Sequence, residues 1–331
     1  MKVESLTGFS EKFNRFEDKH RHIICYVYAL SATVFWTTTD FLVKALPRQT
    51  SSQILFFRSL EMFGLTILMM DLKKMDYYFP GTTINRMLFS RGILGSLGMS
   101  LNFYGVKQVP VSEAQVISQT SPAIVGIFAV IFLKEKYTLT QFLGVLFCFC
   151  GVIFVVKPDF LFHLDQEQRE ESNYKFFGMI ALLTGTIFTA STQILVKKIV
   201  AKTNEGVPTL YFAAIASMFS PIISLYQGFN PFSPYELLIL LLIGTLSFFG
   251  QVLRNKAYIL GNPGRISIMS YFGILYSMFV DVFIIGSILD FYSVIGAVFI
   301  FSSLFVFLYR TIQQENKQKE ELVRKTVSGL K

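Results

Sequence analysis

Charged residues are scarce in this sequence. Asp, Glu, Lys and Arg make up 16% of its 331 residues, against roughly 25% in an ordinary soluble domain. Hydrophobic residues make up 52%, and phenylalanine alone occurs 36 times. A chain this apolar could not cover its surface in water, so the composition excludes a soluble enzyme, a disordered chain and a disulfide scaffold. It predicts an all-α integral membrane protein with several spans.

Residue types that carry catalytic chemistry are also few. The three cysteines lie within apolar runs and lack metal-ligand spacing, and the three histidines lie outside those runs. A nucleotide-binding loop of the form GxxxxGKS or GxxxxGKT does not occur. We therefore expect no enzymatic activity, no cofactor and no metal site.

Long apolar stretches dominate what is present. Each has about 20 residues, the length that a helix needs to cross the hydrocarbon core of a bilayer. The sequence predicts ten such transmembrane helices, at 23–44, 51–72, 86–107, 111–133, 138–156, 176–198, 207–226, 235–258, 264–287 and 290–310.

Basic residues indicate how these spans are oriented. Most of the 30 Lys and Arg residues lie in the N-terminal segment, in alternate loops and in the C-terminal tail. Cytoplasmic segments collect such residues, so we expect both termini in the cytoplasm and read the net charge of +8 as orientation, not as nucleic-acid binding. The predicted regions are a cytoplasmic segment (1–22), a first half (23–156), an acidic non-cytoplasmic loop (157–175), a second half (176–310) and a basic cytoplasmic tail (311–331).

The two halves repeat each other. FWTTTDFLVK at 35–44 matches FTASTQILVK at 188–197, and Gly98 and Ser118 match Gly250 and Ser270 at an almost constant offset. Each half holds five predicted spans, an odd number, so the second half would be inverted in the membrane. Inverted repeats are typical of alternating-access transporters, with the substrate site near the midplane.

A family resemblance rests on residues in the first half. These are Arg58, Arg91-Gly92, Ala114, Pro122, Lys134-Glu135-Lys136, Gly151 and Pro158. With them, 91–162 closely resembles the EamA domain of the drug/metabolite transporter superfamily, and is most similar to the G subfamily of solute carrier family 35. The second half departs from the pattern, with Ser287 and Ile274 where Glu135 and Pro122 stand in the first.

The resemblance implies a fold and an activity. Its fold would be ten helices in two EamA-like repeats with cytoplasmic termini. Its activity would be carriage of small polar metabolites, with carboxylate transport nearest for the G subfamily, although substrates vary widely within one fold.

Charged residues within the spans are the first candidate site. Arg58 and Glu61 lie near the midplane of span two, three residues apart on one helix face. They form either a structural ion pair or a substrate site in which Arg58 attracts an anion while Glu61 tunes Arg58 or binds a proton. Asp40 and Lys44 are read as a local pair, and Asp281 is a candidate proton site.

Basic residues at the predicted inner boundary are vestibule or coupling candidates. They are Arg91, Arg254 and Lys256, with Arg265 nearby. Either they reach outward to water, as long basic side chains commonly do, or they surround a cationic cavity mouth that concentrates anions.

Uncharged polar residues complete the predicted substrate site. They lie in spans three, four, six, eight and nine, and are Asn102, Tyr104, Gln115, Gln119, Gln193, Gln251 and Tyr271. Hydrogen bonding between helices is the alternative role for each. Gly92, Gly95 and Gly98 recur every three residues and predict close helix packing, since no strand precedes them as a dinucleotide site would require.

The sequence thus predicts a secondary-active transporter that moves a small polar, anionic metabolite of the organic-acid type by alternating access. Alternatives are a nucleotide-sugar antiporter, and a non-transporting regulatory membrane protein that acts through its tail. The expected partners are the lipid bilayer and a small-molecule substrate, and a homodimer is compatible with this architecture. The sequence does not distinguish the plasma membrane from an endomembrane.

Overall fold

The computed structural model of the chain is all-helical in the part it describes. That part comprises residues 21–77, 81–118, 166–200, 202–260 and 269–286 except 271, with scattered positions among 120–154 and 291–313. The described elements are α2 (Arg21–Lys44), α3 (Ser51–Leu72), α4 (Thr82–Gln108), α5 (Val111–Ser118), α9 (Gln166–Val200), α10 (Val207–Gln227), α11 (Pro234–Leu260), α13 (Phe272–Val280) and the π-helix η2 (Asp281–Ile285).

Four helices are long and apolar enough to cross a membrane. They cover Ser51–Leu72, Tyr174–Val200, Val207–Leu225 and Pro234–Leu260. Helices α2 and α4 have 24 and 27 residues, so at about 1.5 Å per residue they also exceed the hydrocarbon thickness. The protein is therefore a multi-pass membrane protein. The predicted span 138–156 lies largely outside the described residues, and 290–310 is described only at scattered positions, so the count of ten stays a prediction.

Short polar sequences set where the helices begin. The hydroxyl of Thr50 accepts a hydrogen bond from the backbone N–H of Gln53 and so caps α3. At the start of α11, Ser233 and Glu236 bond each other's backbone N–H groups. This reciprocal pair is the capping box, which satisfies two otherwise unpaired donors at a helix start.

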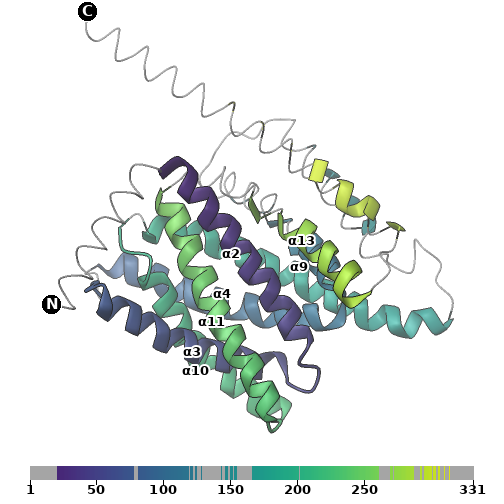
Figure 1. Cartoon of the computed structure of the whole chain (residues 1–331), viewed down its shortest axis with the longest axis horizontal. Coiled ribbons are helices and arrows are strands. Elements are labelled where there is room, and N and C mark those ends of the chain that lie inside the picture. The colour runs from purple at the N-terminus through teal and green to yellow at the C-terminus, as the bar shows by residue number, and fades with distance from the viewer. Residues whose placement is uncertain are drawn as a thin grey trace, which may run out of the picture.

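The helices pack in pairs from opposite halves of the chain. The most extensive contacts join α4 to α9 and α2 to α11, and the second pair lies side by side in Figure 1. Helix α10 packs on α3 and α4, and α11 also packs on α3. The interior between them is therefore built from both halves.

Glycines allow the closest of these crossings. A Cβ atom on Gly98 of α4 would lie 3.1 Å from the carbonyl oxygen of Gly185 on α9, and one on Gly185 would lie 2.8 Å from that of Gly98. A Cβ on Gly92 or Gly95 would likewise press on α10 side chains, Ile215 and Phe212. The close helix packing predicted from these three spaced glycines is confirmed.

Substituting Gly98 tests this crossing. We expect Gly98→Ala to lower the stability of the folded protein by about 1–3 kcal/mol, because the added methyl group meets a backbone oxygen that can move only with its helix. The matched control is Gly64→Ala in α3, where an added Cβ meets nothing within 4 Å. Thermal unfolding in detergent compares the two, and equal midpoints would contradict the packing argument.

Candidate functional site

An internal cavity of about 180 Å³ lies among the helices of both halves. Seven of the residues predicted from sequence line it. They are Arg58, Arg91, Asn102, Gln115, Gln193, Gln251 and Arg254. The side chains come from α3, α4, α5, α9 and α11, so residues far apart in the chain share one polar space.

Other predicted site residues lie elsewhere. Tyr104 and Lys256 are not among the described residues of the cavity lining, and the side chain of Tyr104 is exposed on the outside of α4. Lys256 lies near the ring of Tyr28, with its Nζ 5.4 Å from the ring centroid. Gln119 and Tyr271 lie outside the residues that the structure describes.

Asp281 is buried at the start of η2, away from the described cavity lining. Its Oδ2 accepts a hydrogen bond of 2.8 Å from the backbone N–H of Ser112, in the first turn of α5. A carboxylate at this position satisfies a helix N-terminal donor and interacts favourably with the helix dipole. This partner is a backbone group 169 residues away in the sequence, so no local pattern around Asp281 could have predicted the contact.

The Arg58 side chain is buried and projects into the cavity. Its Nε donates to the hydroxyl of Ser247 at 2.6 Å, and its Cζ lies 5.4 Å from the centroid of the Phe103 ring. Among the described residues, its Nη1 has no hydrogen-bond partner. The guanidinium is thus held in place from one side, with a donor left over on another.

Arg58 and Glu61 do not form the ion pair considered from sequence. The hydroxyl of Thr245 donates to Glu61 Oε1 at 2.6 Å, and Glu61 packs against Gly244 of α11. Three residues of α-helix leave side chains about 60° apart around the axis. Here that difference directs Arg58 into the cavity and Glu61 to the contact between α3 and α11.

Arg91 extends the cationic region. Its side chain is only 4% exposed, so it is buried instead of reaching outward to water. Its Cζ lies 4.5 Å from the centroid of the Phe212 ring, and Arg58 contacts the same ring at 5.8 Å. Arg91 Nε has no hydrogen-bond partner among the described residues. Two cations therefore contact one aromatic ring, which offsets part of their desolvation.

Arg254 and Trp36 form a third cationic contact in the lining. The Arg254 Cζ lies 3.9 Å from the centroid of the indole ring. The Nε1–H of Trp36 is buried, and no acceptor in the described part of the chain bonds to it. Trp36 is the sole tryptophan of the sequence, and sequence reasoning did not single it out.

Asp40 is the second lining residue that sequence reasoning missed. Gln115 Nε2 donates to Asp40 Oδ2 at 2.7 Å, whereas Lys44 Nζ donates to the backbone oxygen of Val109 at 2.7 Å. The predicted local pair of Asp40 and Lys44 is therefore wrong, because the last-turn lysine satisfies a carbonyl beyond the end of α4. The internal repeat could have predicted this position, because Asp40 aligns with Gln193, a residue that the sequence places in the substrate site.

The electrostatic balance of the lining is positive. Three arginines and one aspartate are the charged residues among the described lining, which leaves a formal charge of +2 when all are ionised. The apolar surroundings strengthen every charge interaction in such a space. The arrangement is suited to holding an anion.

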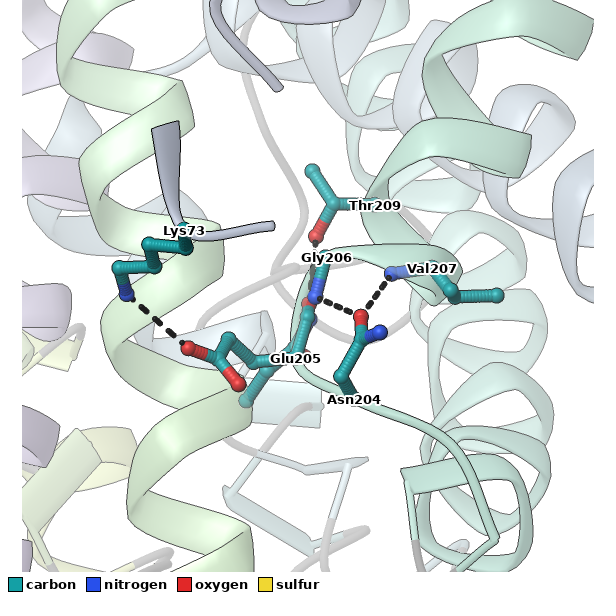
Figure 2. A network of polar contacts seen from close by, with 7 residues as sticks. Lys73, Asn204, Glu205, Gly206, Val207 and Thr209 are labelled. Carbon is teal, nitrogen blue, oxygen red and sulfur yellow. Dashed lines mark hydrogen bonds and ion pairs between the residues drawn. The ribbon is translucent and has the colours of Figure 1, made fainter. Parts of the chain in front are cut away.

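A polar network joins this cavity to a loop at one end of the bundle. Gln251 Nε2 donates to Asn255 Oδ1, and both residues line the cavity. Asn255 Nδ2 in turn donates to the backbone oxygen of Glu205 at 2.8 Å and to the Thr209 hydroxyl at 3.0 Å. Figure 2 shows the next link, in which Lys73 Nζ lies 3.2 Å from Glu205 Oε1.

Asn204 shapes the same loop. Its Oδ1 accepts hydrogen bonds from the N–H groups of Gly206 and Val207, as Figure 2 shows, and so caps α10. Its Nδ2 donates to the backbone oxygen of Asp76, in the connection that follows α3. The α9–α10 loop is therefore attached both to the end of α3 and to the cavity residue Asn255.

The unpaired arginine donors predict an unusual effect on stability. A buried polar group without a partner costs about 1–3 kcal/mol, so Arg58→Met should raise the thermal midpoint of the ligand-free protein. The matched control is Arg86→Met, at an exposed position of α4, which should leave the midpoint unchanged. Scanning fluorimetry in detergent measures both. Marked destabilisation by Arg58→Met would show that the guanidinium is needed for the fold.

Comparison with known proteins bears on the whole chain. The EamA-like transporter family matches residues 23–157 and again 176–309. Human solute carrier family 35 member G1 is 28% identical over 280 residues, which is 83% of this chain and 76% of that protein. The pseudopaline exporter CntI of Pseudomonas aeruginosa is 24% identical, over 75% of this chain and 83% of the exporter.

Two further similarities complete the comparison. The S-adenosylmethionine uptake transporter of Rickettsia prowazekii is 26% identical, over 66% of this chain and 70% of its own length. A solved crystal structure at 14% identity gives a TM-score of 0.62 over 85% of this chain and 94% of the other, which shows a shared fold. With both halves matched, the chain belongs to the EamA-like transporter family.

Proposed function

We propose that this protein is a secondary-active transporter of a small polar, anionic metabolite of the organic-acid type, working by alternating access. The carrying observation is that the cavity presents hydrogen-bond donors without acceptors. Among the described residues, Arg58 Nη1, Arg91 Nε and Trp36 Nε1 are buried without a hydrogen-bond partner, and all three residues line the cavity. Buried polar groups are nearly always paired, so donors gathered in one space would bind an acceptor-rich ligand.

Charge and size support the same substrate class. A ligand with two negative charges would neutralise the formal +2 of the described lining. The volume of about 180 Å³ is below the roughly 300–1,000 Å³ of pockets for drug-sized ligands. These two properties favour a small organic acid over a nucleotide sugar, which is much bulkier. Relatives named for export or uptake of a metabolite make transport the activity to expect.

The inverted repeat would supply the two moving parts. Helix pairs α4–α9 and α2–α11 make the most extensive contacts. In the repeat α2 corresponds to α9 and α4 to α11, so each pair is the counterpart of the other. The crossing of Gly98 with Gly185 has its counterpart at Gly250, where an added Cβ would lie 3.5 Å from the oxygen of Ala32. These matched contacts support a two-fold relation with the cavity at its centre.

Polar contacts at both ends of α3 would act as alternating closures. At its C-terminal end lie Lys73 and Glu205. At its N-terminal end, Gln53 Nε2 donates to the backbone oxygen of Asn230 at 2.7 Å, and Lys107 donates to the backbone oxygens of Leu46 and Gln49. Breaking one set while keeping the other would open the cavity to one side of the membrane. From the basic residues, we propose that the Lys73 end is cytoplasmic.

A ligand screen tests the substrate class. The panel for thermal shift would hold di- and tricarboxylates, nucleotide sugars, neutral amino acids and organic cations. A ligand at 100 times its dissociation constant stabilises the folded state by about 2.7 kcal/mol. We expect carboxylates to raise the midpoint of the wild-type protein and to lose that effect in Arg58→Met.

The matched control for the screen is Glu61→Gln, at an embedded acid outside the described cavity lining, which should keep the response. A shift with cations alone would overturn the anionic substrate. Uptake of the responding carboxylate into proteoliposomes then measures transport. If deletion of 312–331 abolished cellular function while uptake persisted, the tail-based regulatory function would be favoured instead.

Weakening one closure tests alternating access. Glu205→Gln removes the ion pair with Lys73 but keeps the backbone oxygen that Asn255 binds. A partly exposed ion pair contributes about 0.2–1 kcal/mol, so a cysteine placed at Thr189 in the cavity should react with a thiol reagent up to about fivefold faster. The background would lack the native cysteines. Lys202→Gln, at an exposed site in the same loop, is the control, and an unchanged rate in Glu205→Gln would contradict the closure.

A further inference from the structure

We propose that Asp40 is a proton-binding site that couples proton movement to anion transport. The inference rests on the proposed function, because it concerns the same cavity. Asp40 is the acid among the described residues that line this space, and it comes from α2, whereas the three arginines come from α3, α4 and α11. It therefore adds a negative charge, from a separate helix, to the space that holds the three cations.

The contacts of Asp40 leave one oxygen open to a proton. Gln115 Nε2 donates to Oδ2 at 2.7 Å, and among the described residues no hydrogen bond reaches Oδ1. The side-chain amide of Gln115 can both donate and accept a hydrogen bond. Its contact with Asp40 therefore persists whether the carboxyl group is ionised or neutral. Among the described residues, no basic nitrogen lies within 4.0 Å of the Asp40 carboxylate, and the ion pair that these residues form joins Lys73 to Glu205.

The groups facing Asp40 from neighbouring helices define its electrostatics. Arg58 of α3 attracts the ionised carboxylate, and Arg91 of α4 and Arg254 of α11 line the same cavity. From α13, the Tyr276 hydroxyl lies 3.2 Å from the hydroxyl of Thr38, which projects from nearly the opposite face of α2 to Asp40. On its own helix, Lys44 is engaged by the oxygen of Val109.

Binding of an anion would change this balance in a predictable direction. An anion held by Arg58 and Arg91 would offset the positive charge that favours ionised Asp40, and would add a negative charge to the same low-dielectric space. Both effects favour the neutral carboxylic acid. Proton and anion would then bind with positive cooperativity, and linkage makes the effect reciprocal, so a proton on Asp40 strengthens anion binding by the same factor.

Transport would follow as symport. A proton from water on one side binds Asp40 Oδ1 together with the anion at the arginines. After the cavity opens to the other side, the anion leaves and Asp40 returns the proton to that water. One proton moves per anion at this site, and the proton gradient can drive accumulation of the anion.

Binding measured against pH tests the proposal. The probes are succinate and ethane-1,2-disulfonate, a dianion of similar length that keeps both charges between about pH 5 and 8. For the wild-type protein we expect the disulfonate dissociation constant to fall as pH falls, by at most about tenfold per pH unit for one linked proton.

The variant Asp40→Asn resembles the protonated state and should bind the disulfonate tightly at every pH. Glu61→Gln, at another embedded acid, should keep the wild-type dependence and serves as the matched control. A wild-type affinity that does not vary with pH, or a pH dependence kept in Asp40→Asn, would overturn the proton site while leaving the anion carrier intact. Failure of both probes to bind the wild type at any pH would overturn the proposed function and this inference together.

A second measurement does not depend on the folding of the variant. Calorimetry of disulfonate binding to the wild-type protein in buffers of different ionisation enthalpy counts the protons taken up. We expect uptake of a fraction of a proton, approaching one at the higher pH values. Zero uptake across this range would overturn the proposal.

Discussion

Buried positive charge is the constraint on which this structure depends. Arg58 and Arg91 are held inside an apolar helical bundle, each with a guanidinium nitrogen that no described residue bonds. Charges in such surroundings are costly unless they are paired or contacted by polarisable groups. Aromatic rings supply part of that compensation, with Phe212 shared by both arginines and Trp36 under Arg254. Under the proposed function, an anionic substrate would supply further compensation.

The helix crossings make such a cavity possible. Glycines at the α4–α9 crossing bring the two backbones into contact, which leaves the polar faces of the helices to enclose one space. Both halves of the chain contribute to its wall, with Asn102 from α4 and Gln193 from α9 on one side and Gln251 from α11 on another. A movement of one half against the other would therefore change the shape of the site directly.

The polar contacts outside the cavity link its wall to the ends of the bundle. Asn255 belongs both to the wall and to the network that attaches the α9–α10 loop. The ion pair of Lys73 and Glu205 lies at the edge of that network (Figure 2). Such contacts are individually weak at a surface, so under the proposed transport function they would be the ones to break while the glycine crossings stay packed.

Composition and pattern by themselves determined the membrane class, the apolar helices and the family, because bilayer burial requires long apolar runs that are visible in the chain. They also identified Arg58, Gln115 and Gln251, since polar residues within such runs are rare. They could not decide which polar residues meet. Glu61 lies about 60° around α3 from Arg58 and bonds Thr245 instead, and Asp40 bonds Gln115, not Lys44. Those pairings depend on helix rotation and on contacts between distant segments, which only the tertiary structure decided.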